Sequence, residues 1–248
     1  MMMPTEYAGT RWRLLSAVCR SWRAIKTKLD FLLLLAAVVV FNAHLAGLGS
    51  GGWALYRPSA VAAGQWWRLF THPFVHVSWY HLLLDAGAFF MLYDGLEIEC
   101  VLRRMLLLPI CAAGGLLAAL LFSPQVDVAG LCGLSGTAHG LMAFSGLEVM
   151  RNPARRGSGA ALFGLVTVKS LYELATGRVF FDFLHMGLCG APVAACHFGG
   201  VAGGLVAFAL FAVLPQRGAT TPVGHGGRGG CLHVYSPDFP RWRIIRPR

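Results

Sequence analysis

Residues 130–140 read GLCGLSGTAHG, and this stretch decides the fold because it joins a glycine-rich turn to an apolar run, Leu141–Met150. The run has the length and composition of a buried helix, so Ser135 lies on its first turn. Backbone N–H groups there lack intrahelical partners and carry the positive end of the helix dipole. This geometry suits a nucleophile that attacks a carbonyl and then holds an oxyanion. The alternative is that Ser135 only caps the helix.

The composition indicates a membrane protein. Of the 248 residues, 56% are hydrophobic and 13% are charged, about half the charged fraction of a soluble domain. The mean hydropathy is +0.60. The net charge of +10 comes from basic residues between and beyond the apolar segments, which argues against a nucleic-acid partner. The 7 cysteines form no C-x-x-C pair and fall mostly in or beside apolar runs, so we expect neither disulfides nor a zinc knuckle.

The apolar segments predict an all-α polytopic membrane protein, a bundle of six transmembrane helices. The predicted spans are Phe31–Leu48, Trp79–Leu96, Val101–Phe122, Ser135–Met150, Ala160–Ala175 and Pro192–Leu214. The basic start and first apolar run also resemble a signal peptide, but the later segments favour a spanning anchor. The loop Gly49–Ser78 is rich in Trp and Tyr, so we expect it in the outer lipid–water interface.

Charge divides the chain into three regions and predicts its orientation. These are a basic segment over 1–29, a membrane domain over 30–215, and a Gly/Pro/Arg-rich tail over 216–248 that we expect to be disordered. Both termini are predicted to be cytoplasmic, because almost all of the 21 Lys and Arg residues then face inside. The exceptions are Arg57, Arg68, Lys169 and Arg178. This orientation puts Ser135 at the outer end of its helix, and anionic lipid headgroups are the expected contact of the basic ends.

Several polar side chains within the apolar segments need an explanation, because a charge near the bilayer centre costs about 3 kcal/mol. His81 and Asp85 are spaced to share one helix face. His197 lies about one turn inside the last span, at a depth similar to that of Ser135. His139 lies one turn after Ser135, where it either orients His197 or makes an ordinary helix contact. His197 itself has the alternative of a structural hydrogen bond.

Small residues predict how the fourth and sixth spans meet. Gly136 and Gly140 on one helix, with Gly200 and Gly204 on the other, have the spacing that lets helix backbones approach closely. Tight packing there would bring the serine and the last-span histidine within hydrogen-bond reach. Ordinary helix packing is the alternative explanation for these glycines.

Other arrangements remain open at this stage. Lys169 and Glu173 are spaced for an ion pair on one helix face, although contact with a substrate is the alternative. A transporter with a charge relay lacks the support of an inverted repeat. A metal or haem protein lacks an H-E-x-x-H motif. Its candidate ligands would be His72, His76, His81, His139 and His197.

Three motifs together resemble the rhomboid intramembrane serine proteases over about residues 64–210. They are GQWWRLFTHPFVHVSWYHLLLD (64–85), GLSG (133–136) and CHFGGVAGG (196–204). The first is similar to the family's first loop and second helix, with a Trp-Arg pair and a His-x-x-x-Asn. The second is similar to the nucleophile motif, and the third to the His-x-x-Gly-x-x-x-Gly of the last core helix.

The resemblance implies roles for individual residues, and no metal or cofactor. Ser135 would be the nucleophile and His197 the general base. His81 and the Ser135 N–H would form the oxyanion hole, supported by Gly133. The family's Asn is replaced by Asp85, whose ionised form would repel an oxyanion. Asp85 therefore either works protonated, which burial favours, or supports His81.

GLSGTAHGLM (133–142) and VKSLYELATG (168–177) are most similar to the rhombosortase subfamily. That similarity implies membrane-anchored protein substrates with a Gly-rich motif, an apolar C-terminal span and a basic end. It also implies residence in a bacterial inner membrane. The enzyme would cleave the C-terminal anchor, and the bilayer itself would be a further partner. The alternative is a catalytically inactive relative that binds client transmembrane helices.

Overall fold

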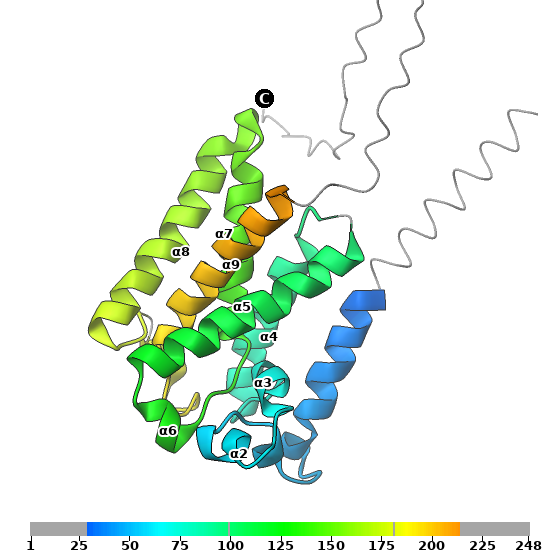
Figure 1. The fold of residues 1–248 in the computed structure, drawn as a ribbon, viewed down its shortest axis with the longest axis vertical. Helices are drawn as coiled ribbons and strands as arrows, with labels where there is room; N and C mark the ends of the chain where they lie inside the picture. Colours follow the sequence, from blue (N-terminus) through cyan, green and yellow to red (C-terminus); the bar gives the residue numbers. More distant parts are fainter. Residues whose placement is uncertain (1–28, 99, 181, 214–248) are drawn as a thin grey trace, which may run out of the picture. The chain divides into compact units, whose positions relative to one another are not determined.

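The computed structural model describes residues 29–98, 100–180 and 182–213, which form a bundle of helices (Figure 1). Extended backbone pairs there at an isolated bridge between Tyr56 and Leu131, and these residues contain no β-strand. The all-α expectation is confirmed for this part of the chain. The predicted basic segment, apart from residue 29, and the predicted tail lie outside the described residues.

Long helices make up the bundle. They are Leu29–Phe41, α4 (Trp79–Asp94), α5 (Val101–Phe122), α7 (Ser135–Met150), α8 (Arg156–Thr176) and α9 (Ala195–Val213). The bounds of α5 and α7 are as predicted. α8 begins at Arg156 instead of Ala160, because Asn152 caps a 3-10 turn, η4 (Pro153–Arg155), that leads into it. α9 begins at Ala195 instead of Pro192, because the residues before it run as irregular backbone along a cavity.

The first described helix ends at Phe41, and the prediction that it continues to Leu48 is wrong. Asn42 is buried where the helix ends. Its amide donates to the carbonyls of Val38 (2.7 Å) and Phe74 (2.6 Å), which ties the end of this helix to the following loop. A short 3-10 helix, η1 (Ala43–Ala46), follows and stops at a glycine with a φ of 83°.

The loop before α4 is folded onto the bundle instead of being extended. It contains η2 (Gly51–Trp53), α2 (Pro58–Ala62), α3 (Arg68–Thr71) and η3 (His72–Phe74). Arg68 is buried and donates to the carbonyls of Gly52 (2.6 Å) and Leu55. The aromatic rings stay on the outside, with Trp66 62% exposed. A buried guanidinium and exposed indoles suit a loop at a lipid–water interface.

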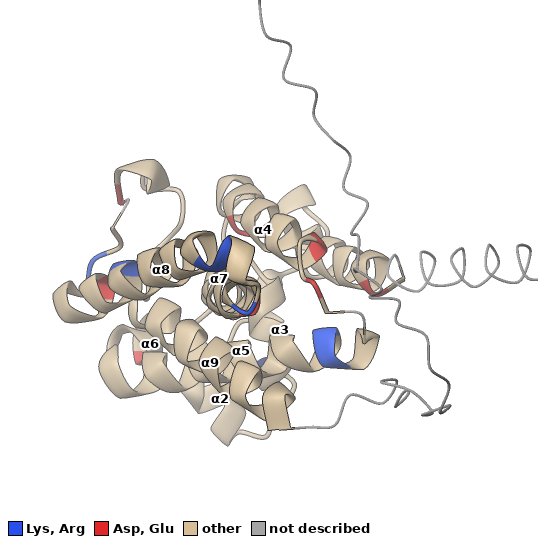
Figure 2. Cartoon of the chain, turned by 90° about the horizontal axis from the view of Figure 1, so that it is seen from above, with Lys and Arg blue, Asp and Glu red and all other residues tan. Residues whose placement is uncertain are grey.

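Two of the described helices, α5 and α9, are long and apolar enough to cross a membrane by length and hydropathy alone. Figure 2 shows that few charged residues interrupt the described helices. Leu29–Phe41 is a shorter apolar helix. The count of six transmembrane helices therefore stays a prediction.

Glycines let α9 pack tightly against two neighbours at once. A methyl group at Gly200 or Gly204 would overlap the carbonyl oxygen of Gly136 or Gly140 in α7. Gly199 and Gly203, on an adjacent face, meet backbone of α5 instead. The structure thus brings together the glycines that the sequence paired, and Gly199 and Gly203 provide the close approach to α5.

A buried polar network, here called the inner network, joins three helices: the first described helix, α4 and α5. It consists of Asp30, Tyr93 and Arg104, each at most 5% exposed. One Asp30 oxygen accepts from the Tyr93 hydroxyl (2.7 Å) and lies 3.1 Å from Arg104 Nε. The guanidinium also lies over the Tyr93 ring and donates to the Tyr93 carbonyl. Each charge therefore has a partner within the network.

Candidate active site

Ser135 is the first residue of α7 and follows a turn that requires glycine. Gly130 and Gly133 have φ angles of 79° and 102°. A side chain at Gly133 would also collide with Asp85 and His81. No side chain of the preceding residue caps the helix, and the Ser135 N–H instead donates to Asp85 Oδ2 (3.1 Å). Ser135 is therefore not the N-cap residue, and its hydroxyl is free of that role.

His197 lies in the first turn of α9 and is held from behind. The ring is buried, and Nδ1 is 2.7 Å from an oxygen of Glu173 in α8. The preceding residue, Cys196, lines the same cavity as Ser135. A methyl group at Gly136 would lie 3.0 Å from the Cys196 carbonyl oxygen. The starts of α7 and α9 therefore adjoin.

Ser135 and His197 line the same cavity, whose volume is about 270 Å³. The other polar lining residues include His81, Asp85, His139 and Lys169. A second possible nucleophile, Cys132, also lines it, but burial raises the pKa of this thiol to about 12. Cys132 therefore stays protonated at neutral pH, which leaves the serine as the better candidate.

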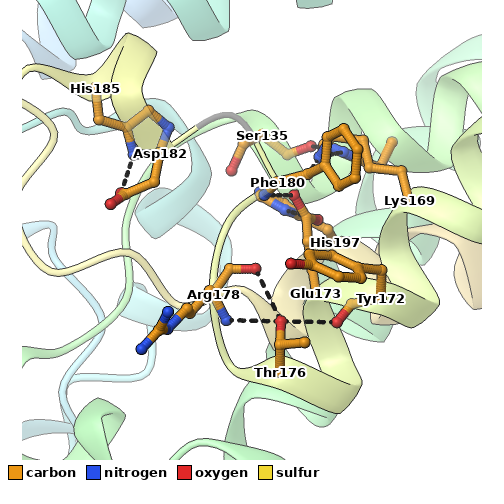
Figure 3. A network of polar contacts seen from close by, with 11 residues as sticks. Ser135, Lys169, Tyr172, Glu173, Thr176, Arg178, Phe180, Asp182, His185 and His197 are labelled. Atoms are coloured by element: carbon orange, nitrogen blue, oxygen red, sulfur yellow. Dashed lines mark hydrogen bonds and ion pairs between the residues drawn. The ribbon is translucent and has the colours of Figure 1, made fainter.

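Figure 3 shows Ser135, Lys169, Glu173 and His197 gathered in one polar network. Lys169 donates to Glu173 (2.6 Å) and contacts Nε2 of His139 (2.8 Å). Nδ1 of His139 is 2.7 Å from the Ser135 carbonyl, so this nitrogen carries the proton. The His139 and His197 rings stack, with centroids 4.0 Å apart and planes inclined by 9°. His139 thus stacks on His197 and does not hydrogen-bond to it.

A second carboxylate, Asp85, faces Ser135 from α4. Its Oδ2 accepts from the Ser135 N–H and lies 3.2 Å from His81 Nε2 and 3.4 Å from His76 Nε2. The two predicted oxyanion donors therefore converge on one carboxylate oxygen. Burial lowers the pKa of His76, while the nearby Asp85 opposes that shift. Asp85 therefore accepts a hydrogen bond from the Ser135 N–H and contacts the rings of His81 and His76.

The predicted histidines do not converge on one point. His72 lies apart, with Nδ1 against the Arg68 carbonyl (3.2 Å), and burial lowers its pKa to about 4. Among the described residues, a group with metal-ligand spacing is His139, Glu173 and His197, whose ligand atoms lie within 4.8 Å of one another. The Lys169 ammonium already contacts two of these residues, so a cation stands where a metal would bind.

Comparison with known proteins agrees with this architecture. A family model for the rhomboid domain matches residues 63–213. The chain belongs to the rhomboid family. Rhomboids are mostly intramembrane serine proteases that act on membrane proteins within the bilayer, so this chain is a membrane protein. Among curated proteins, no match to the chain is found.

One contact in the candidate site is not predicted by the sequence. The sequence predicts that Glu173 pairs with Lys169 or contacts a substrate, whereas the structure also places its carboxylate against His197. The available signal was an acidic residue within an apolar span, where burial without several partners is costly. Helix spacing reveals a partner on the same helix but not one on a neighbouring helix, so the contact could not be derived.

Proposed function

We propose that this rhomboid is an active serine endopeptidase in which Ser135 and His197 form the catalytic dyad. The observation that carries the proposal is that both residues line one cavity where the starts of α7 and α9 adjoin. Nδ1 of His197 is already engaged by Glu173, so Nε2 is the nitrogen available to the serine. The hydrogen bond from the Ser135 hydroxyl to Nε2 of His197 is part of this proposal.

The chemistry follows from these positions. His197 takes the hydroxyl proton of Ser135 as the serine oxygen bonds to the substrate carbonyl carbon. The tetrahedral oxyanion is stabilised by the Ser135 N–H and His81, the donors that now meet at Asp85. The C–N bond then breaks, and His197 returns the proton to the leaving amine. Water, activated by His197, hydrolyses the acyl-enzyme and regenerates the serine. No step requires a metal or cofactor.

The proposed substrates are membrane proteins whose C-terminal anchor carries a Gly-rich motif, as the rhombosortase-like motifs suggest. An intact helix keeps its carbonyls hydrogen-bonded, so glycines would let the anchor unwind and present a peptide bond. The proposed setting is a bacterial inner membrane with both termini cytoplasmic. The distribution of Lys and Arg supports this orientation and would place the cavity towards the outer face.

A fluorophosphonate probe tests the nucleophile directly. We expect the full-length protein in membranes to become labelled and the Ser135→Ala variant to lose labelling completely. His197→Ala should reduce labelling by at least about 100-fold, because the hydroxyl loses its base. Cys132→Ser is the matched control, since it changes another cavity residue without removing the dyad. Equal labelling of wild type and Ser135→Ala would contradict the proposed enzyme and favour an inactive relative that binds client helices.

A second experiment tests the substrate class. The chain is co-expressed with a reporter whose C-terminal span follows a Gly-rich segment, and with a matched reporter in which leucines replace those glycines. We expect release of the first reporter by wild type and none by Ser135→Ala. Cleavage of both reporters at the same rate would retain the protease but remove the glycine requirement.

A further inference from the structure

Glu173 lies directly behind the proposed general base and is completely buried. One oxygen is 2.7 Å from His197 Nδ1. The other oxygen accepts from Lys169 (2.6 Å) and from the backbone N–H of Phe180 (2.9 Å). Figure 3 shows these contacts converging on the carboxylate from α8, α9 and the loop after α8. A carboxylate with donors on both oxygens is fixed in position and held in its ionised form.

The contact fixes which nitrogen of His197 carries the proton. An ionised carboxylate can only accept, so Nδ1 is the protonated nitrogen and Nε2 carries the lone pair. His197 lines the cavity and Glu173 does not, so the carboxylate stands on the far side of the ring. This is the order of groups in which a carboxylate orients an imidazole for a serine.

Lys169 has two partners, and each one helps hold His197. Its ammonium neutralises Glu173 and donates to Nε2 of His139. Because Nδ1 of His139 donates to the Ser135 carbonyl, both ring nitrogens of His139 are engaged and the ring is neutral. The stacked His139 ring therefore forms a fixed wall beside His197.

We propose that Glu173 is a positioning residue that completes a Ser135–His197–Glu173 triad, with Lys169 as its counter-ion. The inference rests on the proposed function and deepens it, because a dyad needs no buried carboxylate on Nδ1. During catalysis the imidazole gains the serine proton and becomes a cation between the serine and Glu173. The carboxylate stabilises that cation without taking up the proton.

Other charged or titratable groups also face the cavity. Asp85 and His81 approach from α4, but Asp85 is engaged by the Ser135 N–H. His185 approaches from η5 (Asp182–His185) and is 3.7 Å from Asp182. From α7 and α8 the neighbours of His197 are His139, Lys169 and Glu173. Of these carboxylates, Glu173 is the one in contact with His197.

The test compares Glu173→Gln with Glu173→Asp in the full-length protein, using reporter cleavage over a range of pH. Glutamine keeps the shape but removes the charge, so we expect kcat to fall by about 10²–10⁴-fold. The acidic limb of the pH–rate profile should move to lower pH by about 1 unit or more, because the imidazolium loses its anionic partner. Glu173→Asp should recover part of kcat and return the limb towards its original position.

Two further variants keep the test decisive. Glu173→Gln leaves the Lys169 ammonium without its carboxylate, and such an uncompensated charge can destabilise the fold. The double variant Lys169→Met/Glu173→Gln removes both charges and so avoids this problem. It should fold and show at least the loss of kcat seen in Glu173→Gln, because Lys169 also holds His139 beside His197. Glu148→Gln is the matched control, because this α7 carboxylate pairs with Arg151 away from the cavity. It should retain the wild-type profile.

The outcomes separate the two proposals. Wild-type kcat and an unmoved acidic limb in folded Glu173→Gln would overturn the triad and leave the dyad intact. A lower kcat with an unmoved limb, not restored by Glu173→Asp, would also overturn it, because that pattern reports damaged packing. Full activity in Ser135→Ala would instead overturn the proposed function.

Discussion

The bundle buries two charged networks, and they differ in whether they face a cavity. The inner network of Asp30, Tyr93 and Arg104 directs its charges at one another. The site network of His139, Lys169, Glu173 and His197 also pairs its charges, but three of its members line the cavity. The cavity is lined by His81 near the start of α4, whereas Tyr93 of the inner network lies near the end of that helix, roughly 18 Å further along it.

The difference teaches how to separate stabilising from functional polar groups in an apolar bundle. A closed network such as the inner one joins three helices and has no ring nitrogen or hydroxyl facing a cavity. The site network leaves a histidine nitrogen available beside a serine. Burial of charge alone therefore does not mark a site, and contact with a cavity is the distinguishing feature.

The largest expected effect comes from opening the inner network. Arg104→Met leaves the Asp30 carboxylate buried without its cation, which typically costs about 3–5 kcal/mol of stability. We expect a marked loss of folded protein, measured by thermal unfolding in detergent. Reporter cleavage per folded molecule should stay near the wild-type value, because the network lies outside the cavity.

The double variant Asp30→Asn/Arg104→Met is the matched control for this prediction. It removes both charges and should recover part of the lost stability, as partners in one network do not act additively. A large fall in turnover with unchanged unfolding would mean that the inner network serves the site, and the contrast between the networks would disappear.

The fold was largely predictable because apolar periodicity and glycine spacing are local signals. The bounds of α5 and α7 followed from the run of apolar residues, and the meeting of α7 and α9 from their glycines. The end of the first described helix was missed because Asn42 acts through contacts with Phe74 and His76, which are distant in sequence. No local pattern encodes such a contact.

The candidate site was predictable in its residue types but not in its pairings. Ser135 and His197 could be chosen because each lies in the first turn of an apolar helix. The contact between His197 and Glu173 depends on how α8 is rotated against α9, which helix periodicity does not specify. For the same reason, the convergence of the Ser135 N–H and His81 on Asp85 appeared only in the structure.

Substitution of Asp85 should have an intermediate effect on activity. This carboxylate lines the cavity and contacts the proposed oxyanion donors, the Ser135 N–H and His81. We expect Asp85→Asn to raise kcat/KM several-fold, about 1 kcal/mol of transition-state stabilisation. The amide oxygen can still accept from the Ser135 N–H and His81, while the negative charge that competes with the oxyanion is gone. Steady-state reporter cleavage measures kcat/KM. Asp85→Leu, which removes the acceptor, should lower kcat/KM.

A loss of activity in folded Asp85→Asn would contradict this expectation. It would show that the carboxylate charge itself is needed, for example to hold His81 and His76 together. The protonated-donor hypothesis would then be wrong as well, because asparagine supplies the same donor without a proton to lose.

The smallest expected effect comes from a charged pair that is neither closed in nor beside the cavity. Arg155 donates to Glu97 through Nη1 (2.7 Å) and Nη2 (3.0 Å), but the two side chains are 40% and 47% exposed. Exposed pairs contribute little to stability because solvent screens them, so Arg155→Gln should leave thermal unfolding and reporter cleavage nearly unchanged. If Arg155→Gln destabilised the protein as much as Arg104→Met, burial away from solvent would not be the reason why the inner network stabilises the fold. The stabilising effect would then come from linking two helices. Arg155 links the start of α8 to the end of α4, just as Arg104 links α5 to the first described helix.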